Sequence, residues 1–117
     1  MPPADPSRRC PRARLGFAVI NDAATPTVAV RGEIDLDNAD HLTHVLTAAL
    51  REAPAGLVVD LAGVTFLGAA GIGALVVCRA AAERAGRRFT LTNPRPMARR
   101  VLEITGLADL LHPAAIH

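Results

Sequence analysis

The hydrophobic and polar positions along the chain predict a pair of strands at the start of a folded domain. Residues 15–21 (LGFAVIN) are mostly apolar, as expected for a strand. Residues 27–31 (TVAVR) resume with a period of two that places both valines on one face. Turn-forming residues at 22–26 separate the two runs, so we expect a hairpin. Residues 32–35 (GEID) are expected to break the second strand.

A helix is predicted next, because the apolar residues then recur at the spacing of one helical stripe. Asp37 or Asn38 can cap its start. His41 and His44 lie off the stripe and are expected to face solvent, since no carboxylate or cysteine completes a metal site with them. The stripe consists of Leu42, Val45, Leu46, Ala49 and Leu50.

Residues 56–86 form the stretch around which the rest of the chain is organised. The apolar run 57–59, closed by Asp60, predicts a short strand that is buried on both faces. A small-residue turn at 68–71 (GAAG) leads into a helix that is apolar nearly all round in its first turns. Such a helix is either buried in its own domain or half-covered by a partner. A glycine-flanked turn at a helix N-terminus is a usual place for a working surface.

One more strand and one more helix complete the pattern. The strand is expected over 89–92, and the helix follows a cap-and-proline segment at 93–96 and stops at Gly106. Residues 107–112 are expected to add a short strand or turn. The inward residues of this helix are expected to be Met97, Val101 and Ile104, and the outward ones Arg99, Arg100 and Glu103.

The order of these elements, β-β-α-β-α-β-α, predicts the fold class α/β. We expect a single domain over 15–112, in which a mixed β-sheet packs against α-helices. Residues 1–14 are expected to be a disordered basic arm, and residues 113–117 a tail without pattern. The 117 residues suffice for one domain with a core and are too few for two.

The net charge and the hydropathy of the chain argue against several classes of function. The net charge of +2 is uneven, because the arm carries four arginines and one aspartate and the remainder nine arginines and ten acids. A basic arm on a nearly neutral domain is usually solvated, so we expect no nucleic-acid or membrane-surface partner. No run of 18 apolar residues suggests a membrane span, and no signal peptide is evident. A cytoplasmic location is therefore expected.

The residue types give little support to a catalytic site or a cofactor-binding site. The single serine, Ser7, lies in the arm, the four histidines lie away from the turn, and no nucleophile–base set can be assembled. The glycines at 68, 71 and 73 match a dinucleotide fingerprint poorly, and phosphate binding at the helix N-terminus is a weaker alternative. We expect no enzyme activity, no cofactor and no metal.

The two cysteines, Cys10 and Cys78, form neither a metal site nor a disulfide framework. Two reduced thiols are the simplest interpretation. A redox switch, in which oxidation at Cys78 disturbs a contact face, is the alternative.

Three blocks of sequence carry a resemblance to a known family: residues 30–46 (VRGEIDLDNADHLTHVL), 56–76 (GLVVDLAGVTFLGAAGIGALV) and 91–111 (LTNPRPMARRVLEITGLADLL). In this order they resemble the STAS domain family of anti-sigma factor antagonists, over roughly residues 15–112. The resemblance implies a partner, an anti-sigma factor of the GHKL kinase type, whose binding frees a sigma factor. In that family, phosphorylation of the antagonist by the kinase abolishes binding.

The resemblance also implies site residues. The family's phosphorylation motif, Asp-Ser-Ser/Thr-Gly, falls on 68–71, so the acceptor position is occupied by Ala70, which has no hydroxyl. The nearest hydroxyl is that of Thr65. We therefore expect no phosphorylation switch at the turn. The partner-binding residues are expected to be Gly32, Glu33, Asp35, Gly68, Ala69, Ala70, Gly71 and Ile72.

Other functions on the same fold stay open. STAS-like chains also act as subunits of lipid-transport complexes and as ligand-sensing modules, and the missing acceptor makes these functions more plausible. Formation of a homodimer is open as well.

Overall fold

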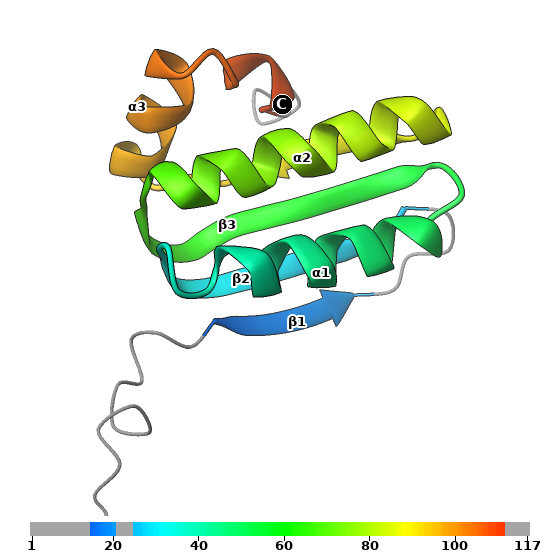
Figure 1. Cartoon of the computed structure of the whole chain (residues 1–117), viewed down its shortest axis with the longest axis horizontal. Helices are drawn as coiled ribbons and strands as arrows, with labels where there is room; N and C mark the ends of the chain where they lie inside the picture. The colour runs from blue at the N-terminus through cyan, green and yellow to red at the C-terminus, as the bar shows by residue number, and fades with distance from the viewer. Residues whose placement is uncertain (1–14, 21–24, 112–117) are drawn as a thin grey trace, which may run out of the picture.

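The protein was analysed as a computed structural model, which describes residues 15–20 and 25–111 (Figure 1). Four strands form one sheet in the order β1-β2-β3-β4. β1 pairs antiparallel with β2, whereas the pairs β2–β3 and β3–β4 are parallel. The predicted hairpin and mixed sheet are confirmed. The strands are β1 (Gly16–Ile20), β2 (Thr27–Ile34), β3 (Gly56–Leu67) and β4 (Arg88–Thr92).

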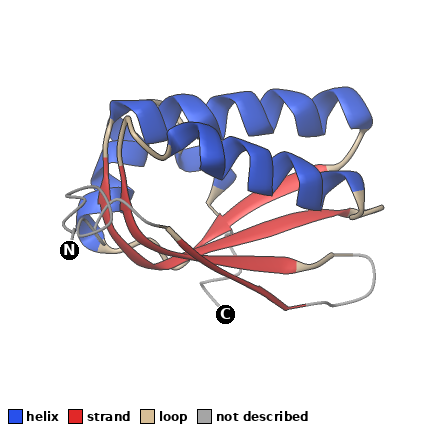
Figure 2. Cartoon of the chain, turned by 60° about the horizontal axis from the view of Figure 1, so that its bottom comes forward, coloured by secondary structure: helices blue, strands red, loops and turns tan. Residues whose placement is uncertain are grey.

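Three helices connect and follow these strands. α1 and α2 run side by side over one face of the sheet (Figures 1 and 2), as expected where helices join parallel strands. α3 contacts β3, and a short 3₁₀ helix follows it. The element order is the predicted one. The helices are α1 (Ala39–Arg51), α2 (Ala69–Ala85), α3 (Pro96–Ile104) and the 3₁₀ helix η3 (Ala108–Leu110). The arm, the turn at 21–24 and the tail lie outside the described residues.

The core lies between the sheet and the two long helices. Because side chains alternate along a strand, every second residue in β4 and in the first halves of β2 and β3 is buried in this core. α1 contributes its predicted leucine stripe, and α2 contributes small residues that let it lie close to the sheet. The main core residues are Val28, Val30, Leu42, Leu46, Leu50, Leu57, Val59, Leu61, Ala74, Leu75, Cys78, Leu91 and Leu102.

Two predicted strand ends are wrong. β2 does not break at 32–35 but continues to Ile34, and β3 does not stop at Asp60 but continues to Leu67. The reason is that the two strands stay paired through two register shifts, one between Ala29 and Arg31 and one between Gly32 and Glu33. Such bulges take up extra residues and bend the strand, so the alternation on which the prediction rested is lost.

The predicted bounds of α3 are nearly right, and its outward residues Arg99, Arg100 and Glu103 are exposed as predicted, but of its predicted inward residues only Val101 packs against the core. The helix begins with a proline at its first position and ends before Gly106, which has a positive φ of 83°. Ala98 and Leu102 face the core, whereas Met97 is 51% exposed and Ile104 is 76% exposed. The helix packs on β3 through its alanine–leucine side, so hydrophobicity alone pointed to the wrong stripe.

One glycine fixes how closely α2 approaches β2. A Cβ atom on Gly71 would lie 2.5 Å from Cγ2 of Ile34 and 2.8 Å from Cδ1 of Leu67. A Cβ atom on Gly73, two residues further along the same helix, would meet no neighbouring atom within 4 Å. Of these two glycines, Gly71 alone is therefore needed for packing.

We expect Gly71→Ala and Gly73→Ala to have opposite effects on stability. The methyl group at position 71 overpacks the contact with Ile34, which costs about 1–3 kcal/mol. The methyl group at position 73 meets no atom and favours the helix, which adds about 0.5–1 kcal/mol. Urea unfolding followed by circular dichroism measures both. Equal effects of the two substitutions would contradict the close contact between α2 and β2.

Candidate functional site

The two segments predicted to bind a partner meet at one edge of the sheet. β2 and β3 are parallel neighbours, so their carboxyl ends lie side by side, with Ile34 paired to Leu67. The backbone N–H of Gly68 donates a hydrogen bond to the carbonyl oxygen of Ile34 at 3.0 Å. The β2–α1 loop and the β3–α2 turn are thus joined directly. This edge is where open α/β sheets usually place their sites.

A buried asparagine holds the β2–α1 loop in shape. Asn38 is only 4% exposed. Its Oδ1 accepts from the N–H of Asp35 at 2.9 Å, and its Nδ2 donates to the carbonyl oxygen of Glu33 at 2.7 Å. Asn38 is the N-cap residue of α1, as predicted, but its side chain makes no capping hydrogen bond to the helix. Asn38 instead ties the helix start to the end of β2.

The β3–α2 turn carries no hydroxyl and no charge. α2 begins directly after Gly68, and the N–H of Ile72 donates to the Gly68 carbonyl at 3.1 Å. Ala69 is exposed, Ala70 is half-buried against the core, and Gly71 is buried. The first turn of α2 contains no acidic residue. The turn therefore presents backbone and methyl groups.

Two exposed hydrophobic residues extend this edge, and sequence reasoning did not assign either to the site. Leu36, in the β2–α1 loop, is 82% exposed. Phe66 is 44% exposed, and its ring lies over Gly68, where a Cβ atom would come within 3.1 Å of its Cε2. The signal for Leu36 was a single leucine between Asp35 and Asp37 in a loop. An isolated residue has no periodicity to reveal it.

The edge is acidic around these apolar groups. The segment 32–40 holds four acids and no basic residue: Glu33, Asp35, Asp37 and Asp40. Along α2, Val76 continues the exposed apolar surface. A surface of this kind, apolar at its centre and charged at its rim, is typical of a protein-binding site. We call residues 32–40 together with 66–72 the acidic edge.

Comparison with known proteins assigns the family. The sequence model of a family described as "Mlab, STAS domain" matches residues 17–112. The chain belongs to the STAS domain family. The matched residues take in the whole sheet but for Gly16, and all the helices, so the acidic edge is part of this STAS domain.

Individual relatives agree with this assignment. An anti-sigma-B factor antagonist of Staphylococcus aureus is 29% identical over 85 residues, which span 73% of this chain and 79% of that protein. The crystal structure of an anti-sigma factor antagonist from Mycobacterium paratuberculosis has a TM-score of 0.73 at 30% identity, covering 85% of this chain and 84% of that one. The unphosphorylated anti-sigma factor antagonist SpoIIAA has a TM-score of 0.72 at 20% identity, covering 83% and 86%, and supports the fold alone.

The histidines and acids of this STAS domain form no metal site among the described residues. His44 is exposed, as predicted. His41 is exposed too and makes an edge-to-face contact with Phe17, with ring centroids 5.3 Å apart. Within residues 15–20 and 25–111, no helix is long and apolar enough to cross a membrane.

The environment of Cys78 counts against a redox role. Its side chain is fully buried between α2 and the sheet. Burial disfavours the charged thiolate and raises the pKa of Cys78 from 9.0 to about 11. Since the thiolate is the reactive form, we expect slow oxidation at Cys78 in the folded domain. Cys10 lies outside the described residues.

We expect Cys78 to resist alkylation while the domain is folded. A pKa raised from 9.0 to about 11 lowers the thiolate fraction at pH 8 about a hundredfold. In a Cys10→Ser variant, iodoacetamide should therefore label Cys78 at least about a hundredfold more slowly in buffer than in urea, as read by mass spectrometry. Comparable rates in the two conditions would restore Cys78 as a candidate switch.

Proposed function

We propose that this STAS domain is a non-catalytic anti-sigma factor antagonist, which binds an anti-sigma factor at the acidic edge and so frees a sigma factor. One observation supports the site above all: the hydrogen bond from Gly68 to Ile34 joins the two segments that the family resemblance implicates. The names of the relatives support the partner class. The expected partner is a GHKL-type, kinase-like anti-sigma factor.

The chemistry of the edge defines what the partner must offer. Leu36 and Phe66 are large apolar groups that lose contact with water on docking, so they are candidates for the main contribution to affinity. The surrounding carboxylates favour arginine or lysine on the partner and speed the encounter. The glycines and alanines of the turn let another backbone approach closely.

Our inference about regulation follows from the residue type at position 70, an alanine. A phosphate group would add roughly −1.5 to −2 charges to a half-buried position in an apolar surface, which would oppose docking. Ala70 cannot carry a phosphate, and it does not imitate one. We infer that the domain stays in a binding-competent form unless a ligand or another event away from the turn alters it.

The alternative functions, a subunit of a lipid-transport complex or a ligand-sensing module, gain weight from the same missing acceptor. A capture experiment separates them from the antagonist. The purified chain is the bait in an extract of its own organism, and bound proteins are identified by mass spectrometry. A GHKL-type protein supports the antagonist, whereas transporter subunits support the alternative.

We expect Leu36→Asp to weaken binding to the captured anti-sigma factor at least tenfold, because it removes an apolar contact and adds a charge at the centre of the interface. Ile104→Asp on α3 is the matched control, since Ile104 is similarly exposed, at 76%, but is not part of residues 32–40 or 66–72. Surface plasmon resonance measures both. Equal losses of affinity, or a loss only with Ile104→Asp, would place the interface elsewhere.

We expect Ala70→Ser to create a phosphorylation site that the native chain lacks. Incubation with the GHKL-type partner and ATP should add phosphate at position 70 in this variant and none in the native chain, as read by mass spectrometry. Ala69→Ser is the matched control, because it offers a hydroxyl one residue from the aligned position. Phosphate on Thr65 of the native chain would refute the absence of a switch.

A further inference from the structure

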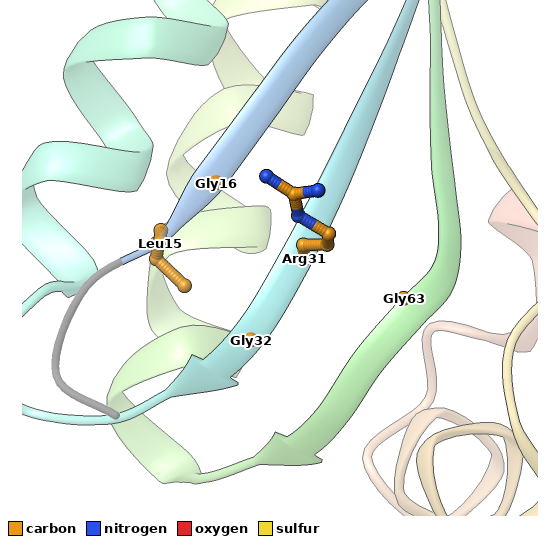
Figure 3. A pocket seen from close by; sticks show the side chains of 5 residues that line it. All are labelled: Leu15, Gly16, Arg31, Gly32 and Gly63. Atoms are coloured by element: carbon orange, nitrogen blue, oxygen red, sulfur yellow. The ribbon is translucent and has the colours of Figure 1, made fainter. Parts of the chain in front are cut away.

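The sheet face opposite α1 and α2 carries a hollow built around one arginine. Val30 faces the core, so Arg31 points to the other side of β2, in front of the sheet in Figure 3. The strand register pairs Arg31 with Gly16 on β1 and with Gly63 on β3. The hollow has a volume of about 470 Å³ and is lined by Leu15, Gly16, Arg31, Gly32 and Gly63.

The two glycines paired with Arg31, Gly16 and Gly63, leave the space that its side chain occupies. A Cβ atom on Gly16 would lie 2.6 Å from Nη2 of Arg31, and one on Gly63 would lie 2.9 Å from its Cγ. The arginine therefore lies across the backbone of its neighbours, where other residues would put side chains. The guanidinium therefore lies on the face of the sheet that α1 and α2 do not cover.

The backbone around the hollow is irregular. The two register shifts between β2 and β3 lie on either side of the pair Arg31–Gly63, and Gly32 has a φ of 113°. Bulges re-aim side chains and are frequent next to binding sites. The irregular stretch is thus confined to the part of the sheet that carries the hollow.

The guanidinium of Arg31 has no partner among the described residues, with which it forms neither a hydrogen bond nor an ion pair. One acid on the same face, Asp60, has partners of its own. Its Oδ1 accepts from the N–H of Ala62 at 2.9 Å and from Nδ2 of Asn93 at 3.3 Å. The five N–H donors of Arg31 are therefore available to a ligand.

We propose that this hollow is an oxyanion site, in which Arg31 binds a phosphate or carboxylate group of a small ligand. A guanidinium matches either group with two parallel hydrogen bonds, which a lysine cannot do. The flanking glycines let the guanidinium lie on the sheet at the hollow, and Leu15, which also lines it, offers an apolar contact to the rest of the ligand. The site lies on the opposite face of the sheet from α1 and α2 and does not depend on the proposed antagonist function.

Titration of the ¹⁵N-labelled full chain tests the site by NMR. Sodium phosphate and sodium acetate are added in separate experiments at constant ionic strength, which removes general screening effects. We expect saturable shifts of the amide signals of Gly16, Gly32 and Gly63 and of the Arg31 Nε–H signal. Saturation by phosphate alone assigns a phosphoryl ligand, and saturation by acetate alone assigns a carboxylate.

Two variants and one control decide whether the hollow itself binds the anion. Arg31→Gln should abolish the saturable shifts. Gly16→Ala keeps every charge but displaces the guanidinium, and it should weaken binding at least tenfold. Arg99→Gln, at an exposed arginine on α3, should leave binding unchanged. Unsaturable shifts, or shifts that persist in a folded Arg31→Gln variant, would overturn the proposal.

Discussion

The contact between the end of β2 and the start of α2 is the constraint on which the acidic edge depends. Ile34 occupies the space that a side chain at position 71 would need, and its carbonyl oxygen accepts the hydrogen bond from Gly68. This contact fixes the turn against the β2–α1 loop. Asn38 then fixes the loop from its other side. On the proposed function, the backbone of the surface that meets the partner is already in place, which lowers the ordering cost of binding.

Much of the fold follows from local pattern. The hairpin, the leucine stripe of α1 and the stop at Gly106 all rest on spacings of a few residues, and the structure agrees with each. The predictions of two strand ends were wrong because pairing between β2 and β3 overrides the local signal of Gly32 and Asp60. The predicted inward face of α3 was wrong for Met97 and Ile104, because the helix packs against β3 through the side that carries Ala98 and Leu102.

The candidate site was predictable only in part, for a related reason. The turn and the β2–α1 segment stand out because glycines punctuate them, and their meeting follows from the parallel pairing of β2 with β3. Leu36 does not stand out, and Asn38 stands out only as a helix cap, since the role of each comes from the three-dimensional arrangement. Burial of an asparagine and exposure of a leucine both run against the usual preference, and only coordinates reveal them.

On the proposed function, the methyl group at position 70 removes control by phosphorylation, so partner binding is controlled by the concentration of the protein. A binder without a covalent off-state occupies its partner according to its concentration relative to the dissociation constant. Its output then follows synthesis, turnover and competition with other antagonists for the same partner. Such a protein acts as a titrant: the total amount of anti-sigma factor must exceed the amount of the antagonist before the sigma factor is held again.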